Sequence, residues 1–268
     1  MKISLILPLV IALYFAAGIL LGVRLSRIAN GRPMSKWGPI ALGLLAVVLH
    51  ASLLYHRIIT PIGLNLGFFN ALSLVSLLVA LLVLLLSFIR PLENLGIVLL
   101  PLAALTSGLE IAFPVPDIVT RGSWPMEAHI VISILAYSLL SIAALQAVVL
   151  AVQDRQLRHK HPGGFIRALP PLQTMESLLF QMIAIGFVLL SLALLSGIIF
   201  IHNIFEQHLV HKTVLSIVAW LVFAVLLWGR WRFGWRGRTA IGWTLGGFFA
   251  LMLAYFGTKL VLELVLHR

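Results

Sequence analysis

Eight long apolar stretches, separated by short polar segments, run along this chain. They lie near residues 4–23, 38–55, 67–88, 95–113, 128–152, 177–201, 213–229 and 239–262. A helix needs about 20 consecutive apolar residues to cross the hydrocarbon core of a bilayer. The pattern therefore predicts an all-α polytopic membrane protein, built as a bundle of eight transmembrane helices.

The apolar runs favour helices over barrel strands. Inside a bilayer no water satisfies the backbone, and these runs are too long and too uniformly apolar for barrel strands. The first run is longer than the apolar region of a signal peptide and its basic residues follow it, so we expect a retained helix. The longest polar stretch, roughly 154–175, leaves no room for a soluble domain. We therefore predict a single transmembrane domain over residues 1–268.

Composition narrows the class of protein further. Apolar residues make up 61% of the 268 residues and charged residues only 10%, which is too few charges to cover a water-soluble domain. The net charge of +11 does not indicate nucleic-acid binding, because the basic residues lie in short loops between apolar runs. The chain has no cysteine, which excludes disulfides, thiolate metal ligands and covalent thioether attachment of heme.

The distribution of Lys and Arg predicts the orientation in the membrane. One set of loops holds most of these residues, and the positive-inside rule places that set in the cytoplasm. With an even number of helices, both termini then lie outside, in the periplasm of a bacterial inner (plasma) membrane. The residues of the basic set are Arg24, Arg27, Arg32, Lys36, Arg90, Arg155, Arg158, Lys160, Arg167, Arg230, Arg232, Arg236 and Arg238.

Seven of the nine histidines map to the outer side. Neutral imidazole is a common ligand for transition metals and for heme iron. A heme suits this boundary, since its porphyrin packs against apolar side chains while its propionates need water or cations. Two histidines from different helices can bind the iron from opposite faces. The outer histidines are His50, His56, His129, His202, His208, His211 and His267.

Two other kinds of chemistry remain open. Residues His202, Glu206, His208 and His211 can supply a zinc, cobalt or nickel site, although their spacing matches no standard signature. Charged residues within or at the edge of membrane spans are functional candidates by default. Here they are Glu110 and Glu176. We favour the interpretation that their carboxylates reach the membrane interface (snorkelling) over a role in a proton relay. No paired carboxylates, nucleophile elbow or phosphate-cradling glycine loop is present, so we expect no enzymatic activity.

Several stretches resemble a known family. They are His211–Trp220 (HKTVLSIVAW), Gly234–Arg238 (GWRGR), Ala254–Gly257 (AYFG), Met175–Leu179 with Leu195–Gly197, and His129 with Leu135–Leu140. Together they resemble the cytochrome c assembly family of heme-handling membrane proteins, which includes CcsA and CcmC and has HemX as a cousin, and within it the YpjD-like branch. The resemblance is strongest over residues 126–268.

The resemblance implies a set of heme ligands. His129 occupies the place of one outer axial ligand and His267 that of the second, so the heme iron would be bound through His129 and His267. The family's tryptophan-rich WWD loop corresponds here to residues 201–211, which contain neither tryptophan nor aspartate. His202 or His211 can then serve as a substitute ligand, and His50 can serve an inner position.

Three functions follow from these observations. The first is a heme-binding inner-membrane protein that assists cytochrome c assembly or heme trafficking, with non-covalent heme as its cofactor. The second is a component for transport or efflux of cobalt, nickel or magnesium ions. The third is a HemX-like regulatory membrane subunit. The expected partners are the lipid bilayer, heme, and cytochrome c maturation proteins or another membrane subunit, but not nucleic acid.

Overall fold

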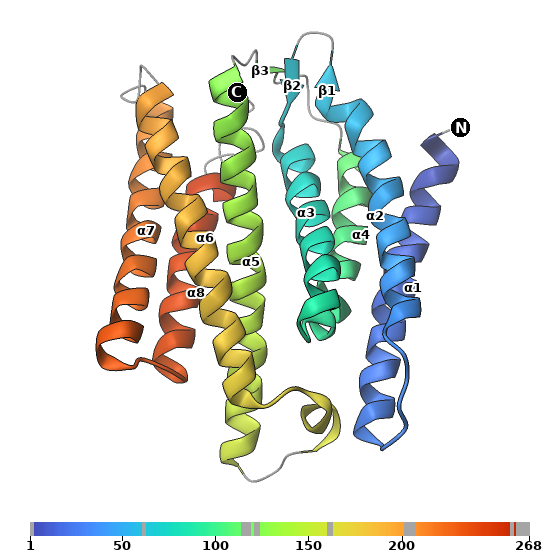
Figure 1. The fold of residues 1–268 in the computed structure, drawn as a ribbon. Helices are drawn as coiled ribbons and strands as arrows, with labels where there is room; N and C mark the ends of the chain where they lie inside the picture. The colour runs from blue at the N-terminus through green and yellow to red at the C-terminus, as the bar shows by residue number, and fades with distance from the viewer. Residues whose placement is uncertain are drawn as a thin grey trace. The chain divides into compact units, whose positions relative to one another are not determined.

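The part of the chain that the structure describes is almost entirely helical, and eight of its helices are long and apolar enough to cross a membrane, as predicted (Figure 1). The computed structural model describes residues 3–60, 63–113, 119–120, 124–159, 163–200, 207–257 and 260. The α-helices are α1 Ile3–Ala29, α2 Trp37–Ile58, α3 Phe68–Ile89, α4 Gly96–Ala112, α5 Trp124–Arg158, α6 Leu172–Phe200, α7 Gln207–Phe233 and α8 Arg238–Met252. Shorter helices are η1 Glu93–Leu95, η2 Gly164–Ala168 and the π-helix η3 Leu253–Gly257.

Several helices extend beyond the apolar runs that predicted them. The helix α5 covers Trp124–Arg158 rather than 128–152, and α6 begins at Leu172 rather than near 177. Glu176, expected before the sixth helix, therefore lies inside α6. The length of an apolar run measures only the part of a helix that lies in the hydrocarbon core of the bilayer. A helix forms its backbone hydrogen bonds internally, so it can continue beyond that core into the polar region.

The described chain divides into two units, residues 1–121 with 156–170 and residues 122–155 with 171–268. The prediction of one transmembrane domain stays a prediction. The first unit contains α1 to α4, and α1 packs against both α2 and α4. Gly18 permits the close approach of α1 to α4, since a Cβ there would lie 2.9 Å from Cδ of Pro101. Small residues bring helix backbones together in this way inside a bilayer.

A small sheet in the first unit was not predicted. Strands β1 Ile59–Thr60, β2 Gly63–Asn65 and β3 Val119–Thr120 pair antiparallel in the order β1-β2-β3. Two or three residues are too few for alternation of apolar and polar side chains to be recognised. The sheet joins the segment after α2 to the segment after α4, because Leu64 pairs with both Ile59 and Thr120.

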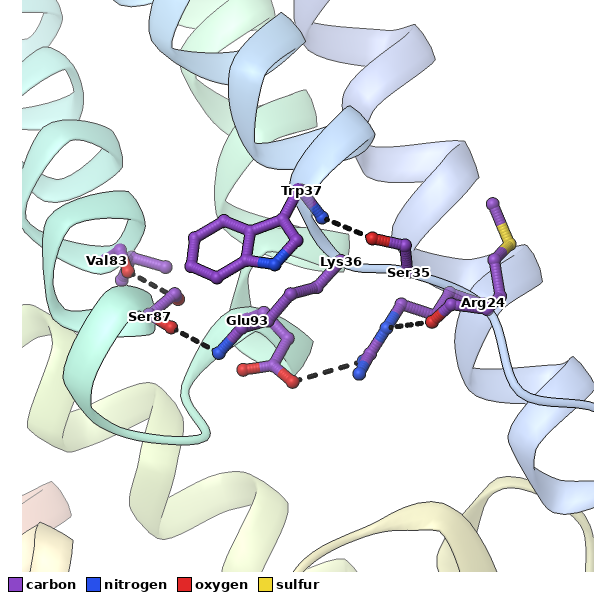
Figure 2. Close-up of polar contacts among 8 residues, drawn as sticks. Arg24, Ser35, Lys36, Trp37, Val83, Ser87 and Glu93 are labelled. Carbon is purple, nitrogen blue, oxygen red and sulfur yellow. Dashed lines mark hydrogen bonds and ion pairs between the residues drawn. The ribbon is translucent and has the colours of Figure 1, made fainter.

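Ion pairs and hydrogen bonds hold the α1–α2 loop to the segments beside it (Figure 2). Nη1 of Arg24 lies 3.1 Å from Oε1 of Glu93, and Nε of Arg24 donates to the Met34 carbonyl at 3.0 Å. Nζ of Lys36 donates to the Ser87 carbonyl at the end of α3, at 2.7 Å. These contacts bring basic residues from one predicted loop set to one end of the unit. That this end is cytoplasmic stays a prediction.

In the second unit, a partly buried ion pair connects α6, α7 and the start of α8. Nη1 of Arg230 lies 2.6 Å from Oε1 of Glu176 and also donates to the Trp235 carbonyl at 3.1 Å. Oε2 of Glu176 accepts from the backbone N–H of Gly237 at 3.3 Å. The guanidinium of Arg230 lies 4.6 Å from the centre of the Phe180 ring. The α7–α8 turn is therefore held by side chains from two helices.

Candidate functional site

His129 lies in the second turn of α5, half-buried against α6. Its Nδ1 is 2.8 Å from Oγ of Ser196. Gly197 leaves room for the ring, since a Cβ at that position would lie 3.3 Å from Cε1 of His129. Two neighbouring residues of α6 thus fix the position of the imidazole ring.

The hydrogen atoms around Ser196 determine which nitrogen of His129 carries the proton. The Ser196 hydroxyl has one hydrogen, which it donates to the Ala193 carbonyl at 2.9 Å. When its hydrogen goes to Ala193, the same oxygen accepts from His129, and Nδ1 is then the protonated nitrogen. A neutral imidazole carries one N–H, which leaves the lone pair on Nε2. An imidazole with its lone pair on Nε2 is a form that binds a metal ion.

An aromatic cluster lies two turns further along α5. The Tyr137 ring contacts Phe248 of α8 at 5.8 Å between ring centres, and it contacts Tyr255 and Phe256 of η3 at 6.1 and 5.3 Å. Tyr137 is buried. The two η3 residues lie in a π-helical turn, a distortion that is frequent at functional sites. Helix α5 therefore carries both His129 and the ring on which this buried aromatic cluster is centred.

Of the other predicted heme ligands on the outer side, the structure describes the side chain of only one. His211 is exposed on α7, while His202 and His267 lie outside the described residues. Within the described ranges, no group of three or more metal-binding side chains comes together. The second ligand of a heme, and the alternative zinc, cobalt or nickel site at residues 202–211, therefore stay predictions.

His50 is fully buried in the first unit, with both ring nitrogens in hydrogen bonds. Nδ1 lies 3.2 Å from the Tyr14 hydroxyl and Nε2 lies 2.8 Å from Oγ of Ser73. In this arrangement neither nitrogen offers a free lone pair to iron. His50 belongs instead to a polar chain that joins α1, α2 and α3.

The two intramembrane carboxylates are buried and paired with arginines. Glu110 is only 2% exposed, and its Oε1 lies 3.6 Å from Nε of Arg57. Glu176 is 8% exposed and binds Arg230. Each carboxylate meets an arginine of another helix, a contact that spacing along one helix cannot reveal. That these carboxylates snorkel to the interface stays a prediction.

Sequence reasoning missed the hydroxyl groups that orient both histidines. Tyr14, Ser73 and Ser196 lie within apolar runs, where single hydroxyl residues are common and hydrogen-bond their own helix. A usable signal exists only for Ser196, since it stands beside Gly197 in a segment that carries the family resemblance.

Comparison with known proteins gives consistent matches along most of the chain. The sequence model of the family described as Cytochrome C assembly protein matches residues 38–266. The inner membrane protein YpjD of Escherichia coli (strain K12) is 38% identical over 238 residues, covering 85% of this chain and 89% of YpjD.

Two further relatives match shorter parts. An uncharacterized 28.8 kDa protein of Azospirillum brasilense is 31% identical over 163 residues, covering 58% of this chain and 59% of its own. The cytochrome c biogenesis protein CcsA of Synechococcus sp. (strain CC9902) is 27% identical over 192 residues, covering 63% of this chain and 62% of CcsA. No solved structure matches the chain.

Proposed function

Because this chain belongs to the cytochrome c assembly family, in its YpjD-like branch, we propose that it binds heme and assists cytochrome c assembly or heme trafficking. It is a multi-pass inner-membrane protein. The observation that carries the proposal is the geometry of His129, whose Nδ1–H is tied to Ser196 while the lone pair stays on Nε2.

The residues around His129 fit a heme ligand. Histidines that bind metals usually donate their other N–H to a protein oxygen, which fixes the ring and makes it a better ligand. Ser196 provides that oxygen, at 2.8 Å. The rings packed around Tyr137, two turns along the same helix, are the kind of apolar side chain against which a porphyrin packs. Heme suits this donor set because the chain has imidazoles but no thiolates.

In this proposal, His129 and His267 would hold the heme iron, with His202 or His211 as the substitute for His267. Heme bound there would supply an iron that accepts imidazole nitrogens, so that these residues would retain the porphyrin. Ser196 and Gly197 orient His129, and the arginine-paired Glu176 holds α6 and α7 together at the α7–α8 turn. Because the 201–211 loop has no tryptophan, we expect heme binding with fewer contacts than a WWD loop would provide.

Absorption spectroscopy of the detergent-purified protein tests the proposal. We expect added hemin to give a red-shifted Soret band of bis-imidazole character, and His129→Ala to weaken that band strongly. His56→Ala is the control, because His56 is exposed in the first unit; its spectrum should match the unchanged protein.

Two outcomes would overturn the proposal. One is a protein that takes up no hemin under any condition, especially if it binds cobalt or nickel ions instead. The other is an equal loss of the Soret band in both variants, since the effect would then not be specific to the site at His129.

A further inference from the structure

The turn between α7 and α8 carries arginines whose charge no carboxylate of the described chain neutralises. Arg232 lies in the last turn of α7, Arg236 lies between the helices and Arg238 begins α8. All three side chains are exposed, and none forms an ion pair with a described residue. Glu176, the carboxylate that reaches this turn, is already bound to Arg230. The turn therefore presents a concentrated positive charge to its surroundings.

The neighbouring sequence supplies no acidic residue that could pair with these arginines. Residues 207–262, which include all of α7 and α8, contain neither aspartate nor glutamate. Elsewhere the chain does neutralise arginines near helix ends, since Arg24 pairs with Glu93 and Arg57 with Glu110. An anionic partner for the α7–α8 turn therefore has to come from the membrane or from solution.

Large aromatic side chains stand among the arginines and are exposed as well. Trp231 is 82% exposed, Phe233 60% and Trp228 54%. The guanidinium of Arg232 lies 5.9 Å from the centre of the Phe233 ring, and the Trp228 ring lies 5.3 Å from that ring. Tryptophan is enriched at the level of the lipid headgroups, where one part of the indole meets hydrocarbon and the other meets water. These rings place the turn at the surface of the bilayer.

One face of α7 leads from the hydrocarbon core to the arginines. Its exposed residues recur at alternating steps of four and three, which keeps them on one side of a helix. They are Val214, Val218, Leu221, Val225 and Trp228, and the next step is Arg232. The other side of α7 packs against α8, which runs back from the turn (Figure 1), for example where Phe223 meets Gly247.

The length of this exposed face matches one leaflet of a bilayer. From Val218 to Trp228 the helix rises about 15 Å at 1.5 Å per residue, which is half of the roughly 30 Å hydrocarbon core. An acyl chain along this face would therefore end where Trp228 stands. The phosphate of the same lipid would then lie beside Arg232, one helical turn further on.

We propose that the α7–α8 turn binds the headgroup of an anionic phospholipid, whose phosphate is held by Arg232, Arg236 and Arg238. The planar guanidinium group binds phosphate oxygens through paired hydrogen bonds. A zwitterionic headgroup fits less well, because its own cation would lie among three uncompensated arginines. The exposed aliphatic and aromatic face favours a lipid over a free phosphate or an acidic soluble protein, since neither of these would cover that face.

Native mass spectrometry of the detergent-purified protein, titrated with dioleoyl phosphatidylglycerol, tests the proposal. We expect the first phosphatidylglycerol to bind more tightly than phosphatidylcholine with the same acyl chains. In the combined variant Arg232→Gln, Arg236→Gln and Arg238→Gln, this affinity should fall about 100-fold, because each arginine near an anionic lipid surface contributes roughly five-fold.

A charge-matched control separates a site from a general attraction to net charge. The combined variant Arg27→Gln, Arg32→Gln and Arg155→Gln removes three other exposed arginines and leaves the α7–α8 turn intact. Its affinity for phosphatidylglycerol should stay close to that of the unchanged protein. An equal loss in both combined variants, or no loss in the variant of the turn, overturns the proposal.

A second measurement uses only the unchanged protein, so it does not depend on the folding of a variant. The protein is placed in vesicles of phosphatidylglycerol and phosphatidylcholine, with bromine on the acyl chains of one lipid at a time. Brominated phosphatidylglycerol should quench the tryptophan fluorescence more strongly, and this excess should shrink as sodium chloride is raised from about 0.05 to 1 M, because salt screens exposed charges.

Inorganic phosphate distinguishes a lipid from a free anion as the ligand. At equal ionic strength, phosphate should reduce the excess quenching no more than sodium chloride does, because it lacks the acyl chains that lie along α7. Equal quenching by the two brominated lipids, an excess that does not respond to salt, or specific displacement by inorganic phosphate overturns the proposal.

Discussion

At the scale of single residues, hydroxyl groups decide what the histidines can do. Ser196 gives its hydrogen to its own helix and so accepts from His129, which leaves Nε2 available. Around His50 the hydroxyls of Tyr14 and Ser73 occupy both nitrogens. The same residue type therefore has one ring nitrogen bound to a hydroxyl in one unit and both ring nitrogens bound to hydroxyls in the other.

Removal of the Ser196 hydroxyl should weaken heme binding. Ser196→Ala leaves His129 free to rotate and to change tautomer, and loss of such an orienting group typically costs about 10- to 100-fold in metal affinity. We expect a loss of that order in hemin titrations. Ser196→Thr, which keeps the hydroxyl, should recover most of the affinity.

Ser141→Ala is the matched control for this prediction. Ser141 lies on α5, and its hydroxyl bonds only the Tyr137 carbonyl. An affinity that falls equally in Ser141→Ala and Ser196→Ala, or one that Ser196→Thr does not recover, would contradict the orienting role of Ser196.

At the scale of elements, the α7–α8 turn shows how a short motif sets the path of two helices. Gly234 and Gly237 have φ angles of 67° and 58°, a region that side-chain-bearing residues rarely adopt. The Trp235 ring packs over Gly229 of α7 so closely that a Cβ there would clash with the indole. The GWRGR sequence that carries the family resemblance is therefore a turn fitted to one glycine of the preceding helix.

Gly229→Ala should destabilise this turn. The added methyl group forces Trp235 out of its place, and overpacking of this kind typically costs about 1–3 kcal/mol. Gly242→Ala in α8 is the control, since no described atom lies within 4 Å of its added Cβ; its stability should be unchanged or slightly higher, because alanine favours a helix over glycine. Thermal unfolding in detergent compares the two, and equal stabilities would contradict the packing argument.

At the scale of the whole molecule, the distribution of Lys and Arg predicts the orientation. The chain has no cysteine, so single cysteines report the side of the membrane without background. Asn30→Cys lies in the α1–α2 segment of the basic set, and Ile59→Cys lies at the opposite end of α2; both positions are exposed. We expect a membrane-impermeant maleimide added to intact spheroplasts to label Ile59→Cys but not Asn30→Cys. The reverse pattern would show that the basic loops lie outside.

Most of the helices could be predicted from the sequence, because apolar length is a local property. The resemblance carried by residues such as His129, Trp220 and Tyr255 is confirmed by the family match over residues 38–266 and by the similarity to YpjD. The pairing of Leu64 with Thr120 in the small sheet was not predictable, since its strands are too short to leave a pattern. The pairing of Glu110 with Arg57 was not predictable either, since it joins residues 53 positions apart.

The sequence by itself determined that this is a membrane protein, how many of its described helices are long and apolar enough to cross the bilayer, and which family it belongs to. Those properties depend on whether each segment is more stable in lipid or in water, and on the identity of consecutive residues. Only the tertiary structure decided which nitrogen of His129 keeps its lone pair and which carboxylates are buried beside arginines. Such properties depend on single hydrogen atoms shared between helices, and a linear chain does not record which residues will meet.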